Sequence, residues 1–219
     1  MSDYQEAKQK YENDRATKLG VQAAATWNLD PKRLGFVLSR YKFVAKVLSG
    51  KSRVLEVGSG DAWASRIVKQ QVDTLDCIDI DKDFIRIGNE LIDPSWQINL
   101  REHDALENLA TNLYDAAFAL DVFEHIDPLK ADLFLSNLSN AIKDSGVLVI
   151  GVPTLESQKF SKPNNGHINC MTGTQLKKTL ERYFHNVFVF SMNDEVIHTG
   201  MFEMSNYLLC ICSTKKLPK

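Results

Sequence analysis

The sequence predicts an α/β fold, a doubly wound sheet of seven mostly parallel strands that ends in an antiparallel pair. Short apolar segments alternate with segments of helical periodicity from residue 53 to residue 152, as expected for parallel strands joined by helices. The last two strand-like segments follow one another with no helix between them, so we expect them to pair antiparallel. Tyr114–Leu120 is almost entirely apolar, which is typical of a strand buried on both faces.

The bulk composition is that of one ordinary α/β domain. The chain has 219 residues, of which 44% are hydrophobic and 25% charged, enough to enclose a full core. Its net charge of −2 gives no general attraction to nucleic acid, and no segment reaches the ~18 apolar residues of a membrane span. The polar N-terminus does not resemble a secretory signal, and the cysteines show no CxxC spacing. We therefore expect a cytoplasmic protein in a reducing compartment.

The N-terminal part is expected to form a helical cap over residues 1–50, ahead of a ligand-binding domain at 51–215. Residues 1–30 are polar and show no clear period. Asp30 and Pro31 are typical of a helix start, and Gly50 of a helix end. Between them, apolar residues recur at three-and-four spacing: Leu34, Val37, Leu38, Tyr41, Val44, Ala45 and Leu48.

The remaining elements follow from the same patterns. Strands are predicted at Arg53–Val57, Leu75–Ile80, Trp96–Leu100, Tyr114–Leu120, Val147–Val152, Asn186–Met192 and Asn206–Ser213. Helices are predicted from the glycine turn to Gln71, at Lys82–Leu91, from Asp127 to about Gly146, and at Thr172–Tyr183.

The first predicted strand runs into a glycine turn with the sequence Glu56-Val57-Gly58-Ser59-Gly60. Glycine permits a sharp turn and the close approach of a ligand, and backbone N–H groups at the start of the next helix favour an anionic or polar group there. A dinucleotide site has a third glycine where this chain has Trp63. Glu56 can instead accept a hydrogen bond from an ammonium group, which a dinucleotide lacks. The turn therefore favours S-adenosylmethionine (SAM) over a dinucleotide.

Acidic residues lie at or just after the ends of three other predicted strands. Asp79, followed by Ile80, lies about 20 residues beyond the first glycine, where a carboxylate can accept from ribose hydroxyls. Asp104 follows the third strand and can accept from an adenine amino group, and Asp121 follows the fourth. Asp81 is interpreted as a helix cap. Each of these carboxylates taken alone also fits a cap or a loop, but their order at one sheet edge favours a common site.

At these residues the chain resembles the class I SAM-dependent methyltransferases, over about residues 50–215. The resemblance implies a Rossmann-like fold, SAM as the cofactor, and transfer of its methyl group to a nucleophile (EC 2.1.1.-). Ala62 stands where the family has a third glycine, which implies a slightly displaced ligand. The cofactor-binding residues that it implies are Glu56, Gly58, Ser59, Gly60, Asp79, Ile80, Asp104, Ala105 and Asp121.

Two histidines are candidates for a catalytic base. His167 lies in a polar loop after the fifth strand, beside Asn164, Asn165 and Gly166, which suit a loop that approaches a substrate. His125 follows the fourth strand. Both also fit structural roles, His167 as a loop histidine bonded to carbonyls and His125 as part of a motif shared by relatives with different substrates.

The same region offers a metal-binding alternative. Asp121, Glu124, His125 and His167 provide two carboxylates and two imidazoles, a set that can hold Mg²⁺ or Mn²⁺. Their spacing resembles that of metal-dependent methyltransferases that act on the terminal 2′-hydroxyl of small RNAs. The same letters occur in metal-free relatives and the chain is not basic, so the sequence favours no metal and no nucleic acid.

The acceptor is expected to be a small molecule. The chain resembles small-molecule and bacterial surface-glycan methyltransferases, which implies O-methylation of a small molecule or of a sugar- or phosphate-type precursor of a capsule polysaccharide. Arg33, Arg40 and Lys42 on the capping helix suit an anionic substrate or a solvated helix face. A non-catalytic SAM-binding protein is the alternative from another class, and the sequence does not predict the oligomeric state.

Overall fold

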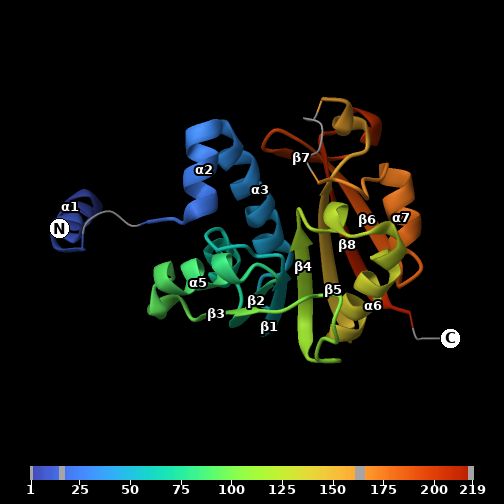
Figure 1. The fold of residues 1–219 in the computed structure, drawn as a ribbon, viewed down its shortest axis with the longest axis horizontal. Coiled ribbons are helices and arrows are strands. Elements are labelled where there is room, and N and C mark those ends of the chain that lie inside the picture. The colour runs from blue at the N-terminus through green and yellow to red at the C-terminus, as the bar shows by residue number, and fades with distance from the viewer. Residues whose placement is uncertain (1, 15–17, 161–165, 217–219) are drawn as a thin grey trace.

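A computed structural model describes residues 2–14, 18–160 and 166–216. Its centre is a sheet of eight strands in the order β3-β2-β1-β4-β5-β8-β6-β7, and in Figure 1 the strands follow one another from β3 on the left to β6 on the right. The strands are β1 Arg53–Val57, β2 Thr74–Asp79, β3 Ile98–Glu102, β4 Tyr114–Leu120, β5 Ile142–Pro153, β6 Phe184–Asn193, β7 Val196–Thr199 and β8 Tyr207–Lys215. The five strands β1–β5 are parallel to one another. The predicted Rossmann-like, mostly parallel sheet is confirmed.

The C-terminal strands are antiparallel, as predicted. β8 lies between β5 and β6 and pairs antiparallel with both. The eighth strand, β7, was not predicted: it forms a hairpin with β6 in which Met192 pairs with Ile197. Its four residues are too few to give a strand period, and Asp194 in the hairpin turn has a φ of 51°.

Helices cover both faces of the sheet. They are α1 Asp3–Asp14, α2 Val21–Leu29, α3 Lys32–Val47, α4 Ser65–Lys69, α5 Lys82–Leu91, α6 Ala131–Ala141 and α7 Gly173–Leu180. Short 3-10 turns lie at Pro94–Trp96, Phe123–His125, Pro128–Lys130, Glu156–Phe160 and Phe202–Met204. No helix in the described ranges is long and apolar enough to cross a membrane.

The core has two layers, one on each side of the sheet. Phe134 and Leu138 of α6 pack with Leu176 of α7 against one face. Tyr41 and Val44 of α3 pack with helix α4 and α5 residues against the other. Each fully buried aliphatic or aromatic side chain contributes about 1.5–3 kcal/mol of transfer free energy, so these layers hold the sheet between its helices.

The boundary between α6 and β5 differs from the prediction. The helix ends at Ala141 and the strand begins at Ile142, whereas the sequence placed the helix end near Gly146. Ile142 pairs with β4 ahead of a shift in register, and Lys143 Nζ lies 2.7 Å from Asp115 Oδ1. Pairing with β4 therefore extends the strand through residues whose local sequence favours a helix end.

The sequence predicted a helical cap over residues 1–50 but did not delimit α1 and α2 within it, and the exposure of these two helices explains why. Every side chain described in α1 is exposed, and α2 buries only Ala23, so neither helix carries an apolar stripe. Figure 1 shows α1 standing apart from the body of the molecule and α2 beside α3. The start of α5 follows the prediction, because the Asp81 carboxylate accepts from the N–H groups of Asp83 and Phe84.

Candidate active site

The glycine turn after β1 has the backbone that the sequence predicts. Gly58 and Gly60 have φ values of 76° and 55°, in the region that favours glycine. A Cβ on Gly58 would lie 2.1 Å from Cγ2 of Val122, in the segment after β4. Gly58 is therefore required for the close packing of the two loops that follow β1 and β4.

Asp79 ties this turn to the end of β2. Gly60 N–H donates to Asp79 Oδ2 at 2.7 Å, and Asp81 N–H donates to Asp79 Oδ1 at 2.9 Å. The N–H groups of Gly58 and Ser59 donate to the carbonyl of Ile78. The amides of Gly58, Ser59 and Gly60 are thus used within the protein.

A first cavity of about 500 Å³ lies beyond the carboxyl ends of β1, β2 and β4. The site residues predicted from the sequence that line it are Gly58, Asp79, Ile80, Asp104, Ala105, Asp121 and His125. Asp104 also accepts from the N–H of Leu106 at 2.8 Å, so it stabilises its own turn. Most of the site residues that were predicted from their positions at strand ends therefore line this one cavity.

Glu56 does not line this cavity, and its hydrogen-bond partners are side chains inside the protein. Its side chain is 1% exposed; Tyr41 Oη donates to Oε1 at 2.7 Å, and the Cys77 thiol donates to Oε2 at 3.3 Å. Burial raises the pKa of Glu56, against the effect of these hydrogen bonds. This arrangement favours a structural role for Glu56 over the predicted contact with an ammonium group. Ser59 and Gly60 also do not line the cavity.

Gln22 of α2 lines the first cavity, and the sequence did not predict it as a site residue. Its backbone N–H donates to Asp61 Oδ2 at 3.1 Å, and a Cβ on Gly60 would lie 2.4 Å from its side-chain Oε1. The helix is thus attached to the glycine turn. Asp61, directly after the turn, was the one sequence feature that could have pointed to this contact.

A second cavity of about 580 Å³ adjoins the first at Asp121, which lines both. Asp121 has a φ of 56°, and Arg40 Nη1 donates to its Oδ2 at 2.7 Å. The Arg40 guanidinium lies 3.7 Å from the ring centroid of Tyr207. Helix α3 therefore reaches the border between the two cavities.

The two predicted histidines lie on either side of this border. His125 lines the first cavity and His167 the second, with ring centroids 5.0 Å apart. Nδ1 of His125 donates to the carbonyl of Gly166 at 3.0 Å, and Nδ1 of His167 donates to Gln158 Oε1 at 2.9 Å. In the neutral form of either ring, Nε2 would then carry the lone pair.

The environment of His167 favours its neutral form. Partial burial, followed by the charge of His125, lowers its pKa below the ordinary value, while Asp121 opposes the shift. Asn164 and Asn165, the predicted neighbours of His167 in this loop, lie outside the described residues. His198, in β7, interacts with Asn193 and lines neither cavity.

Glu124 is buried directly beside the histidines. It is 1% exposed, and within the described part of the chain neither carboxyl oxygen has a hydrogen-bond partner. Burial, followed by the charge of Asp121, raises the pKa of Glu124 to about 8. Ligand atoms of Glu124, His125 and His167 lie within 4.8 Å of one another. Asp121, predicted with them, is paired with Arg40 instead.

Comparison with known proteins identifies the family. Residues 23–184 match the sequence profile of the methyltransferase domain family. The chain belongs to this family. It is a class I, SAM-dependent methyltransferase, as the sequence predicted. No curated protein matches the sequence at a significant level.

Solved structures share the fold of this methyltransferase at low sequence identity. N-methyltransferase NodS from Bradyrhizobium japonicum WM9, in complex with S-adenosyl-L-homocysteine (SAH), is 15% identical, with a TM-score of 0.68 over 94% of this chain and 97% of NodS. A SAM-dependent methyltransferase from Archaeoglobus fulgidus is 20% identical, with a TM-score of 0.66 over 84% and 94%. The methyltransferase domain of a bacterial Hen1, CtHen1, is 17% identical, with a TM-score of 0.62 over 81% and 98%.

Proposed function

We propose that the first cavity holds SAM, that the second holds the methyl acceptor, and that the methyl group passes between them beside Asp121. The observation that carries this proposal is the position of Asp121, which lines both cavities. A methyl transfer needs donor, methyl and nucleophile in line, and two adjoining cavities supply such an arrangement. The N-terminal helices, proposed as a cap over residues 1–50, contribute Gln22 and Arg40 to them.

The residues of the first cavity suit the parts of SAM. Asp79 Oδ1 and Oδ2 each accept one backbone N–H and retain lone pairs for ribose hydroxyls. Asp104 and Ala105 offer a carboxylate and an apolar surface for adenine. Gly58 keeps the floor of the cavity free of a side chain. Bound SAM supplies an activated methyl group.

The second cavity suits activation of a hydroxyl. His167 Nε2 carries the lone pair of a ring whose pKa is lowered, so the neutral base is present at neutral pH. As the acceptor oxygen forms its bond to the methyl carbon, the carbon–sulfur bond breaks and the hydroxyl proton passes to Nε2. His125, in contact with His167 and held by Gly166, orients this pair.

The acceptor is proposed to be a small molecule. A cavity of about 580 Å³ is in the range of small-molecule sites. A sugar- or phosphate-type precursor of a bacterial surface polysaccharide is the class suggested by the sequence resemblance alone. The net charge of −2 argues against an RNA substrate. All four thiols are free, which supports the cytoplasm as the compartment.

The cluster of Glu124, His125 and His167 favours a second candidate, a metal-dependent 2′-hydroxyl methyltransferase. Two imidazoles and a carboxylate within 4.8 Å fit Mn²⁺ or a similar divalent ion, and the Glu124 oxygens lack other partners in the described ranges. In this case the three side chains would hold an ion that polarises the acceptor hydroxyl, and His167 would not take its proton.

Two measurements test the proposal. Calorimetric titration with SAM and SAH separates a methyltransferase from a protein that does not bind the cofactor. A screen with labelled SAM, with and without chelator, then separates the candidates. If methylation of nucleotide sugars or hydroxylated metabolites continues in the presence of chelator, the result supports His167 as the catalytic base. If activity is lost with chelator and restored only by Mg²⁺ or Mn²⁺, the result supports the metal site. SAM binding without transfer to any acceptor would support a non-catalytic role.

A further inference from the structure

One face of α3 lines the second cavity. Arg33, Phe36, Val37 and Arg40 follow the three-and-four spacing of a helix face, and all four border this cavity. The two arginines lie two helical turns apart, about 10 Å along the axis, with apolar surface between them. Two guanidinium groups therefore flank one apolar strip on the same wall.

At least one hydrogen-bond donor of Arg40 has no partner among the described residues. A guanidinium has five N–H donors. One N–H of Arg40 donates to Asp121 and its flat face lies on Tyr207, while its buried Nε–H has no partner among the described residues. The buried hydroxyl of Tyr207 also lacks a hydrogen-bond partner in the described part of the chain. Both groups border the cavity, and both suit an oxygen-rich ligand.

The charge of Arg33 is not offset inside this cavity. Arg33 is exposed and forms no ion pair among residues 2–14, 18–160 and 166–216. Of the two carboxylates in the lining, Asp121 is already paired with Arg40. The other, Asp194, lies in the β6–β7 turn and also borders an outer groove that contains Lys32 and Lys42. The wall of α3 thus presents positive charge to a ligand.

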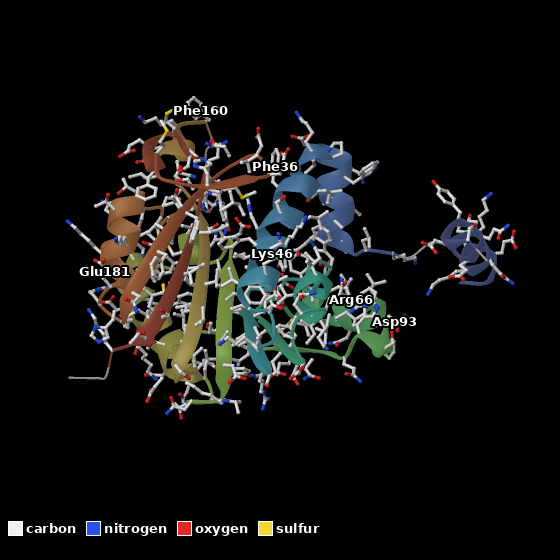
Figure 2. The ribbon with its side chains drawn as sticks, turned by 180° about the vertical axis from the view of Figure 1, so that it is seen from behind. Phe36, Lys46, Arg66, Asp93, Phe160 and Glu181 are labelled. Carbon is white, nitrogen blue, oxygen red and sulfur yellow. The ribbon has the colours of Figure 1, made fainter. Side chains whose placement is uncertain are left out.

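The rest of the cavity is suited to the body of the ligand. Phe36, Phe160 and Met192 provide apolar surface, and His167 lies in the same lining. Figure 2 shows Phe36 toward the end of the molecule that carries Phe160, with Lys46 farther along α3. An elongated ligand can therefore reach both the arginine wall and the proposed base.

We propose that the methyl acceptor is a hydroxylated small molecule with an anionic group, a carboxylate or a phosphate monoester, that is held by Arg33 and Arg40. The planar guanidinium fork matches the oxygens of both anions. The apolar strip of Phe36 and Val37 supports the body of the acceptor, and its hydroxyl lies at His167. This inference rests on the proposed function, because it assigns the second cavity to the acceptor.

The test uses aromatic probes on the full chain saturated with SAH, whose binding is measured first. Ligand-observed NMR titrations compare benzoate with benzamide, and phenyl phosphate with phenol, so that each anion has a neutral counterpart of similar shape. Two variants accompany the wild type. Arg33→Gln removes the exposed cation of the cavity wall without disturbing the Arg40–Asp121 pair, and Lys46→Gln removes one charge from the same helix outside the cavities.

We expect at least one anion to bind about tenfold more tightly than its neutral counterpart, the equivalent of one net charge-assisted hydrogen bond. Arg33→Gln should remove most of this preference and Lys46→Gln should preserve it. The preferred anion distinguishes a carboxylate from a phosphate. Equal affinity within both pairs, no measurable binding of either anion, or a preference that Arg33→Gln leaves intact would overturn the inference. Failure of SAH to bind would instead count against the proposed function.

Discussion

Arg40 of helix α3 holds the carboxylate of Asp121 at the border between the two cavities. The donor–acceptor distance is 2.7 Å, and the Arg40 and Asp121 side chains are 17% and 44% exposed. Asp121 has a left-handed backbone, and its N–H donates to the carbonyl of Gly151. Its position thus depends on a residue 81 positions earlier in the chain. Helix α3 thus helps to set the geometry of this border.

Asp121→Asn should destabilise the protein and keep its backbone. Asparagine tolerates the left-handed region, but the largely buried Arg40 would lose its anionic partner. We expect the free energy of unfolding to fall by about 1–3 kcal/mol, measured by chemical denaturation. Asp83→Asn, which removes one partner of an exposed pair with Arg86 at 3.8 Å, is the matched control and should change stability by less than about 0.5 kcal/mol. If both variants lowered the free energy of unfolding equally, the position of Asp121 would not depend on its pair with Arg40.

Asp79→Ala should weaken SAM binding by about 1.5–3 kcal/mol, because it removes charge-assisted acceptors for the ribose. It should also destabilise the fold, since Gly60 N–H loses its partner. Asp81→Ala should lower stability by about 1 kcal/mol as a lost cap while leaving SAM affinity nearly unchanged. Calorimetry and denaturation measure the two effects separately. The reverse pattern would exchange the roles of these residues.

The sequence could predict that residues at the strand ends share one site, because the carboxyl ends of parallel strands meet at one edge of the sheet. This geometry brought Asp79, Asp104 and Asp121 to one cavity. The position of Gln22 could not be predicted from the sequence. Helix α2 buries so little surface that its sequence shows no periodic pattern of apolar residues. The role of Glu56 depends on Tyr41, which reaches it only after α3 docks on the sheet. Contacts set by helix docking have no local sequence signal.

His167→Ala should lower turnover about 10²–10⁴-fold with SAM affinity unchanged, the usual contribution of a positioned base. His198→Ala is the matched control, since His198 lines neither cavity. The pKa of His167 is below its ordinary value, so the active neutral ring persists through neutral pH. The turnover of the wild type should therefore fall only as the pH drops through that lowered pKa. Full turnover in His167→Ala would exclude this role.

Glu124→Gln should reveal what the buried carboxyl does. The folded-state pKa of about 8 is far above the unfolded value, so the native state retains a proton that the unfolded chain loses. The wild type should consequently lose stability as pH rises from about 4 to 8, relative to Glu124→Gln, which does not titrate. Denaturation of both proteins across this range, with chelator present, measures the difference. Mn²⁺ added at pH 8 should leave both curves unchanged if His167 is the base. A metal site would instead stabilise the wild type and leave Glu124→Gln nearly unaffected, because an ionised Glu124 is the carboxylate ligand of that site.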